Sequence, residues 1–260
     1  MNDLYAGKVA LVTGGTQGVG RAVARALARE GAAGVAIVGR HAVRGARVAA
    51  ELDALGSAGL FVPADLGVTA DCTAVVPAVV ERFGRVDGLV NAAASTARAS
   101  LEETTVDLFD HMFAVNVRAP MLLMQAAIGD MRQRGEGGAI VNILSMSAYG
   151  GQPHLTAYCA SKAALATMTK NVAYAHRFLR IRVNGLNLGW TDTPNEDVVQ
   201  REVHDRPADW LAHAEATAPM GKLAQADEIA DLVALLLSDR GGVMTGSLID
   251  YAQDVLGATD

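Results

Sequence analysis

The sequence predicts an α/β fold: a single-domain, Rossmann-type, doubly wound parallel sheet of seven strands with helices on both faces. Short apolar segments rich in β-branched residues alternate with longer segments whose apolar residues recur at helical spacing, and this order is typical of parallel strands joined by right-handed helical crossovers. The candidate strands are apolar almost throughout, as expected when helices cover both faces of a sheet. A chain of 260 residues, 51% of them hydrophobic, can bury one large core.

The predicted elements follow one another in this alternating order. We expect strands at residues 9–13, 35–38, 60–62, 88–91, 139–144, 181–184 and 247–250. We expect helices at residues 18–30, 42–55, 72–83, 106–134, 157–177 and 227–237. The segment 192–219 breaks the rhythm because it is polar, charged and interrupted by prolines. No repeat or linker divides the chain, so we assign residues 1–260 to one domain, with residues 194–219 as a substrate-binding lid.

The net charge and the cysteines argue against several classes of function. With 22 Lys and Arg against 28 Asp and Glu, the formal charge is −6, and no basic cluster is present to neutralise nucleic-acid phosphates. The first residues show no secretory signal pattern, and no apolar run reaches the ~18 residues of a membrane span. Cys72 and Cys159 form neither a disulfide framework nor a metal motif. We therefore expect a cytoplasmic protein with no membrane, nucleic-acid or metal partner.

A glycine-rich turn follows the first predicted strand. Residues 13–20 read Thr-Gly-Gly-Thr-Gln-Gly-Val-Gly and lead directly into the first predicted helix. Glycines allow a tight turn and let backbone N–H groups approach a pyrophosphate at a helix N-terminus. No Gly-Lys-Ser/Thr follows, so the turn is not a Walker-type phosphate loop. The residues expected to contact a dinucleotide here are Gly14, Thr16, Gln17, Gly18, Val19 and Gly20.

The end of the second predicted strand bears on the choice between NAD and NADP. An acidic residue there binds the ribose 2′-OH of NAD, whereas an arginine accommodates the 2′-phosphate of NADP. The chain has Gly39 and Arg40 at this point and no carboxylate, so we predict NADP as the cofactor and keep NAD as the alternative. Asp65 and Leu66 follow the third strand and are also expected to contact the cofactor. Asp65 could accept from the adenine amino group, or it could cap the next helix.

Four residues form a candidate catalytic group. Tyr158 and Lys162 are spaced to lie on one face of a predicted helix, and a neighbouring ammonium lowers the pKa of a tyrosine, so Tyr158 is a candidate acid/base. Ser145 follows the fifth predicted strand, at the sheet edge where ligands bind, and its hydroxyl could donate to a carbonyl. Asn116 lies in a long predicted helix, where a structural role is the simpler interpretation. Cys159 could be a nucleophile, but on a packed helix we interpret it as an inert hydrophobic residue.

Together these motifs resemble the short-chain dehydrogenase/reductase family over essentially the whole chain. The matching pieces are the glycine turn, Asp65, Leu89-Val90-Asn91, Asn116, Ser145, Tyr158-x-x-x-Lys162 and Gly189-x-x-x-Thr193. The resemblance implies that Tyr158 is the acid/base and that Ser145 positions and polarises the carbonyl. It implies that Lys162 holds the nicotinamide ribose and lowers the tyrosine pKa, and that Asn116 holds a water in a proton relay to this lysine.

The resemblance also extends the expected cofactor site and the expected assembly. Asn91 would support the central sheet beside the cofactor, and Thr193 would touch the nicotinamide carboxamide. Gly189 and Thr191, with Tyr158 and Lys162, complete the expected cofactor contacts. The resemblance implies a homotetramer that uses the helices of residues 106–128 and 157–175, with the C-terminal segment in a second interface.

The chain departs from the family pattern at three places. The family's Asn-Asn-Ala-Gly is Asn-Ala-Ala-Ala at residues 91–94, and alanine is small enough for cofactor binding to survive. The usual Pro-Gly after the sixth strand is Leu-Gly at residues 188–189. The usual C-terminal Val-Asp-Gly-Gly is replaced at residues 250–253 by Asp-Tyr-Ala-Gln, which affects how the C-terminus packs against neighbouring subunits. None of these changes touches the four catalytic candidates.

The predicted function is hydride transfer between a nicotinamide cofactor and a secondary alcohol or ketone. The candidate substrate residues carry hydrogen-bonding groups and few apolar ones; they are Ser147, Gln152, His154, Trp190, Asn195, Glu196 and Trp210. Because buried polar groups favour substrates that satisfy them, we expect a polar, hydroxylated substrate such as a sugar or polyol. The alternatives are a reductase of an apolar or acyl ketone and a non-catalytic NAD(P)-binding module. A nucleotide-sugar epimerase is disfavoured because it needs a larger C-terminal substrate domain.

Overall fold

The computed structural model describes residues 3–256 and is built around one parallel sheet of seven strands. The strand order is β3-β2-β1-β4-β5-β6-β9, and every neighbouring pair runs parallel. The strand bounds are β1 Val9–Thr13, β2 Gly34–Gly39, β3 Ala58–Pro63, β4 Gly88–Asn91, β5 Gly138–Ser145, β6 Ile181–Leu188 and β9 Leu248–Tyr251. The strand order reverses between β1 and β4, which places a ligand crevice at the carboxyl ends of these strands. The expected doubly wound Rossmann-type fold is therefore confirmed.

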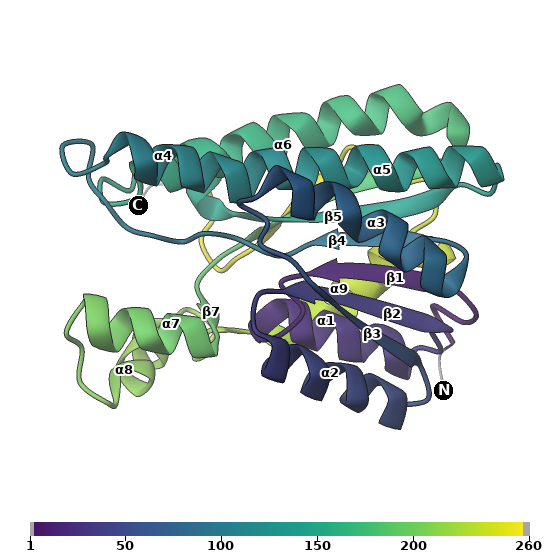
Figure 1. The fold of residues 1–260 in the computed structure, drawn as a ribbon. Helices are drawn as coiled ribbons and strands as arrows, with labels where there is room; N and C mark the ends of the chain where they lie inside the picture. The colour runs from purple at the N-terminus through teal and green to yellow at the C-terminus, as the bar shows by residue number, and fades with distance from the viewer. Residues whose placement is uncertain (1–2, 257–260) are drawn as a thin grey trace.

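Helices cover both faces of this sheet (Figure 1). One layer holds α1, α2 and α9, and the other holds α3, α4, α5 and α6. Their bounds are α1 Gly18–Arg29, α2 Ala42–Ala54, α3 Thr69–Phe83, α4 Val106–Phe113, α5 Ala119–Arg134, α6 Thr156–His176 and α9 Ala226–Leu237. Two apolar clusters result, one on each side of the sheet, and they meet along strands that are buried on both faces.

The long helix expected at residues 106–134 is interrupted by a π-helical segment, Ala114–Arg118, between α4 and α5. Over the whole of Val106–Arg134, this is the one helix within residues 3–256 that is long and apolar enough to cross a membrane by length and composition alone. Half of its most apolar window is buried inside the protein, where α5 packs against α3. We interpret it as a core helix.

Helix α3 begins at Thr69, before the expected residue 72, and the other main differences from the expected elements lie in the second half of the chain. Strand β6 continues past residue 184 to Leu188, where it pairs with β9. Two short strands, β7 Thr191–Asp192 and β8 Ala224–Gln225, pair with each other and enclose the expected lid segment. That segment contains α7 Pro194–Val198, a π-helical turn at Val199–Val203 and α8 Trp210–Thr217. In Figure 1 it lies to one side of the sheet, near the start of α1.

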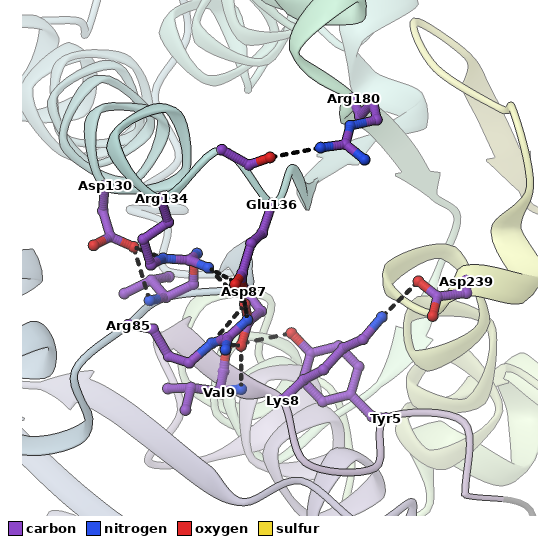
Figure 2. A network of polar contacts seen from close by, with 12 residues as sticks. Tyr5, Lys8, Val9, Arg85, Asp87, Asp130, Arg134, Glu136, Arg180 and Asp239 are labelled. Atoms are coloured by element: carbon purple, nitrogen blue, oxygen red, sulfur yellow. Dashed lines mark hydrogen bonds and ion pairs between the residues drawn. The ribbon is translucent and has the colours of Figure 1, made fainter.

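A polar network ties the amino ends of the central strands together (Figure 2). The carboxylate of Asp87 is buried, accepts from the backbone N–H of Val9 at 2.9 Å, and pairs with Arg85 at 2.6 Å and Arg134 at 3.4 Å. Arg134 also pairs with Asp130 at 3.0 Å. Because these contacts join β1, the start of β4 and α5, they fix the end of the sheet opposite to the ligand crevice.

Candidate active site

A cleft of about 800 Å³ opens at the carboxyl ends of the strands, where the strand order reverses. It is lined by almost all of the predicted cofactor residues: Gly14, Thr16, Gln17, Gly18, Val19, Gly20, Arg40, Asp65, Leu66, Tyr158, Lys162, Gly189, Thr191 and Thr193. Of the catalytic candidates, Ser145, Tyr158 and Lys162 line it. Asn91 and Asn116 lie behind its wall and are absent from its lining.

The glycine turn forms a backbone cradle at one end of the cleft. Gly14 has a φ of +67°, and a Cβ on it would come within 2.9 Å of the Cα of Ala93. A Cβ on Gly20 would collide with the carbonyl oxygen of Gly14. Both positions therefore exclude side chains, which leaves the backbone and the N-terminus of α1 open to a ligand. This narrow, anion-accepting cradle fits the pyrophosphate of a dinucleotide.

Thr13 holds the loop after β4 against this cradle. Its hydroxyl oxygen accepts hydrogen bonds from the backbone N–H groups of Ala92 at 3.0 Å and Ala93 at 3.1 Å. Ala92, Ala93 and Ala94 all line the cleft. Ala94 stands where the family pattern has a glycine. The two residues before it, Ala92 and Ala93, are held by the hydroxyl of Thr13 on β1.

The ribose end of the cleft contains a second arginine that the sequence reasoning missed. Arg44 lies on the first turn of α2, lines the cleft and donates through Nη1 to the side-chain oxygen of Gln17. Arg40 is exposed at the rim, whereas Arg44 is half-buried. The position of Arg44 could have revealed it as a cofactor residue, because the first turn of the helix after β2 faces the glycine turn. The site therefore offers two guanidinium groups where only one was predicted.

Asp65 occupies the predicted place beside the cleft but does not cap a helix. Its Oδ1 accepts from the backbone N–H of Gly67 at 2.9 Å, which forms a tight local turn. Helix α3 begins at Thr69 with Val68 as its N-cap residue. The helix-capping alternative is wrong, because the turn at Gly67 separates Asp65 from the first helical residue.

Tyr158 and Ser145 both line the cleft, and the Ser145 side chain is near enough to the Tyr158 hydroxyl to lower its pKa. Ser145 is the last residue of β5, and its Oγ accepts from the backbone N–H of Ser147 at 3.1 Å. Because that contact uses an acceptor site of the Ser145 hydroxyl, its own hydrogen remains available for donation. The cleft is therefore lined by two hydroxyl-bearing side chains that can donate to a ligand.

Burial controls the protonation of the tyrosine and of the lysine beside it. The Lys162 side chain is buried and donates to the carbonyl oxygen of Ile143 at 2.8 Å, with its Nζ 5.7 Å from the centre of the Tyr158 ring. Burial lowers the pKa of Lys162 to about 8. Burial also raises the pKa of Tyr158 to about 12, against an opposing effect of the Ser145 hydrogen bond. The expected lowering of the tyrosine pKa by Lys162 is therefore wrong for this structure: desolvation dominates, and the effects that oppose it come from Ser145 and Arg98.

Asn116 sits in the π-helical segment, and its amide is engaged by protein atoms. Its Oδ1 accepts from the backbone N–H of Ser95 at 2.8 Å, and its Nδ2 donates to the carbonyl oxygen of Ser95 at 2.9 Å and to the hydroxyl of Ser161 at 3.0 Å. These contacts join the loop after β4 to α6. The side chain thus positions two walls of the cleft.

Asn91 is the other predicted residue that lies behind the wall. Its Nδ2 donates to Oδ1 of Asn142 on β5 at 2.8 Å, and Asn142 donates in turn to the hydroxyl of Thr169 on α6 at 2.9 Å. This chain of bonds links β4, β5 and α6. It is the structural counterpart of the supporting role that was expected for Asn91.

The far end of the cleft is polar. The predicted substrate residues Ser147, Gln152, Trp190, Asn195 and Glu196 line it, with Ser147 Oγ donating to Gln152 Oε1 at 2.6 Å. The predictions for His154 and Trp210 are wrong: His154 is exposed outside the lining, and Trp210 is buried behind Trp190, with their ring centroids 6.0 Å apart. Trp210 instead supports the lid, because its indole N–H donates to Asp197 at 2.8 Å. Arg98 lines this end and was missed, since it lies in a loop without a motif.

No group of three or more His, Cys, Asp or Glu side chains within residues 3–256 is arranged to hold a metal ion. Cys72 is buried and Cys159 is half-buried, and both are free thiols. Burial raises the pKa of both thiols, so neither is activated as a nucleophile.

Comparison with known proteins gives consistent relatives over nearly the full chain. A family model described as Enoyl-(Acyl carrier protein) reductase matches residues 14–251. Galactitol 2-dehydrogenase of Agrobacterium fabrum is 35% identical over 235 residues, covering 89% of this chain and 90% of the relative. The NADP-dependent (R)-specific alcohol dehydrogenase of Lentilactobacillus kefiri is 33% identical over 251 residues, covering 95% and 96%.

Among solved structures, the L-sorbose reductase of Gluconobacter frateurii in complex with NADPH and L-sorbose superposes with a TM-score of 0.92. It is 30% identical to this chain, and the match covers 100% of both chains. The likeness therefore includes the lid segment as well as the sheet.

Proposed function

The chain belongs to the short-chain dehydrogenase/reductase family, and we propose that it interconverts a secondary alcohol and a ketone with NADP as cofactor. The observation that carries the proposal is that Tyr158 and Ser145 line the same cleft as Lys162 and the glycine cradle. The proposed substrate is polar and hydroxylated, of the sugar or polyol kind. Residues 194–219 are the proposed lid within one domain.

The cleft has the features that a nicotinamide dinucleotide requires. The cradle at Gly14 and Gly20 would hold the pyrophosphate, and Arg40 and Arg44 would hold the 2′-phosphate. Lys162, whose Nζ lies 5.7 Å from the centre of the Tyr158 ring, would hold the nicotinamide ribose. When bound, the cofactor accepts a hydride from the carbinol carbon or donates one to the carbonyl carbon. The NADPH complex of the sorbose reductase and the NADP dependence of the alcohol dehydrogenase support this choice of cofactor.

The protein's own part of the reaction is to move one proton and to hold the oxygen. In the direction of reduction, the Tyr158 hydroxyl donates its proton to the carbonyl oxygen, and Ser145 donates a hydrogen bond to the same oxygen. In the direction of oxidation, Tyr158 first loses its proton to solvent and then, as the phenolate, accepts the proton of the substrate hydroxyl. A phenol with a pKa of about 12 is fully protonated at neutral pH, so the structure described here is ready to act as the acid.

The substitution Tyr158→Phe tests this assignment. Loss of the acid should lower kcat by the ~10²–10⁴-fold typical of a lost acid/base, while NADPH affinity changes little. Tyr174→Phe is the matched control, because Tyr174 lies on the same helix with an exposed ring. A Tyr158→Phe enzyme that retains more than a tenth of the wild-type kcat would refute the role of this tyrosine.

The alternative, an apolar or acyl ketone substrate, is less well supported by the lining. The substrate end carries polar side chains from two segments, and two of the relatives are named for polyol or ketose substrates. A substrate panel should therefore give higher kcat/KM for ketoses and polyols than for simple ketones of the same size. A non-catalytic NAD(P)-binding module would show no turnover with any member of the panel.

We also propose that the enzyme is a homotetramer. Large apolar side chains are exposed on one helical layer: Val106 and Phe109 on α4, Met121 on α5, and Phe178 just after α6. Exposed apolar groups of this kind indicate surface that a partner covers. Sedimentation should give four times the mass of the chain at micromolar concentration, and a stable monomer would contradict the proposal.

A further inference from the structure

The carboxylate of Glu196 is fixed at the substrate end of the cleft. Glu196 lies in the first turn of α7, lines the cleft, and has a side chain that is 18% exposed. Its Oε1 accepts from the indole N–H of Trp190 at 2.9 Å and from Nε2 of Gln200 at 2.7 Å, and lies 3.7 Å from Nη2 of Arg98. Donors from three separate segments therefore converge on one oxygen of this carboxylate.

One oxygen of the Glu196 carboxylate remains available to a ligand. Every hydrogen bond found for the Glu196 carboxylate within residues 3–256 goes to Oε1, so Oε2 is a free acceptor. The Nε–H of Arg98 is buried and has no partner among the described residues. A carboxylate oxygen without a protein partner, next to the guanidinium of Arg98, matches a hydroxyl group, because a hydroxyl donates one hydrogen bond and accepts others.

We propose that Glu196, held by Trp190 and Gln200 and paired with Arg98, binds a hydroxyl of a neutral polyhydroxylated substrate and so determines specificity. The inference rests on the proposed function and deepens it, because it names the residue that separates polyols and ketoses from other carbonyl compounds. Glu196 is a specificity residue here, whereas Tyr158 and Ser145 act on the reacting oxygen.

The charges at this end of the cleft favour a neutral substrate over an anionic one. Arg98 and Glu196 carry opposite charges and face each other, so the pair presents no net charge to the ligand. A substrate carboxylate placed there would gain from Arg98 but would be repelled by Glu196. Removal of the glutamate charge should therefore admit anionic substrates while it weakens the binding of hydroxylated neutral ones.

Glu196→Gln tests the proposal with three carbonyl substrates: L-sorbose, cyclohexanone and 4-oxopentanoate. We expect kcat/KM for L-sorbose to fall ten- to a hundredfold, mainly through KM, because a charge-assisted hydrogen bond is lost. The value for cyclohexanone should change less than threefold, and the value for 4-oxopentanoate should rise. Glu202→Gln is the matched control, because Glu202 is exposed on the same lid segment and lies outside the cleft lining. It should leave all three values unchanged.

A binding measurement without turnover separates the possible outcomes. In the Tyr158→Phe enzyme saturated with NADPH, addition of Glu196→Gln should weaken L-sorbose binding about tenfold by calorimetry. Equal loss for all three substrates, or unchanged preference with unchanged sorbose binding, would show that Glu196 only anchors the lid and would overturn the inference. If the wild type turns over cyclohexanone but Glu196→Gln leaves its preference unchanged, the inference alone fails. If the wild type turns over no carbonyl or alcohol substrate, the proposed function fails with it.

Discussion

An aspartate at position 39 should move the cofactor preference from NADP toward NAD. Gly39 ends β2, beside the exposed Arg40 and the half-buried Arg44. A Cβ at position 39 would come within 2.7 Å of Cγ2 of Thr16, so a substitution at this position also crowds the glycine turn. We therefore place the change on a Thr16→Ser background, which removes that methyl group. Gly39→Asn on the same background matches the shape of aspartate without its charge.

The size of the change follows from the contacts. A carboxylate that accepts from the ribose 2′-OH contributes about 1.5–3 kcal/mol, or roughly ten- to a hundredfold in NADH affinity. The same carboxylate repels the 2′-phosphate of NADPH and competes for the two arginines. Solvent screening at the rim reduces the effect through Arg40, so the contribution of Arg44 should dominate. We expect the ratio of NADPH to NADH affinity to fall at least tenfold from the Asn variant to the Asp variant.

Fluorescence titration of each reduced cofactor against the wild type and both double variants measures this ratio. Arg44→Met should also weaken NADPH binding more than Arg40→Met does, with little effect on NADH. Equal affinity of the wild type for NADH and NADPH would refute the reasoning. The same conclusion follows if the Asp and Asn variants give the same ratio, because the charge at position 39 would then have no influence.

Three further predictions concern stability and the walls of the cleft. Because the pKa of Lys162 is about 8 in the folded protein and about 10.4 in an unfolded chain, its burial opposes folding below pH 8 and ceases to do so as the pH rises toward 10. Lys162→Met should therefore raise the free energy of unfolding by up to about 3 kcal/mol at pH 7. In urea titrations this gain in stability should shrink between pH 8 and 10. A gain that stays constant over this pH range would contradict the prediction. Asp87→Asn should lower the free energy of unfolding by about 3 kcal/mol with kcat unchanged, because it leaves Arg85 and Arg134 partly unpaired. As the control, Glu136→Gln changes an exposed partner of Arg85 and should lower the free energy of unfolding by under about 1 kcal/mol. Asn116→Ala should cost about 1–3 kcal/mol and weaken NADPH binding, because the loop at Ser95 loses its anchor; unchanged affinity would limit Asn116 to a purely structural role.

The strands were predictable where burial on both faces imposes an apolar sequence. Strands β1 and β4 begin and end at the predicted residues, 9–13 and 88–91. Strand β6 was predicted too short because Gly185 and Asn187 resemble strand breakers. In the structure, Nδ2 of Asn187 donates to Asp250 at 2.6 Å, across the pair of β6 and β9. A partner that is distant in sequence thus makes a polar strand residue acceptable.

The site was predictable where a motif fixes the backbone and not where tertiary contacts bring side chains together. The glycine turn and the Tyr-x-x-x-Lys spacing carry their own geometry, so their residues line one cleft. Arg98 and Arg44 carry no local signal, because their roles depend on loop and helix positions across the cleft. The pKa of Tyr158 was mispredicted for a related reason: sequence spacing reveals a neighbouring charge but not the depth of burial.

The number of residues in the π-helical segment between α4 and α5 determines how the walls of the cleft are positioned. An α-helix turns by about 100° per residue, so a segment with one extra residue per turn changes the direction in which the preceding helix faces. Accordingly α4 contacts α6, while α5 contacts α3. Deletion of a single residue from Ala114–Arg118 would leave the helix content nearly intact, yet it would turn α4 away and take Asn116 from Ser95 and Ser161. Insertions and deletions in this segment should therefore be tolerated far less than substitutions on its exposed side.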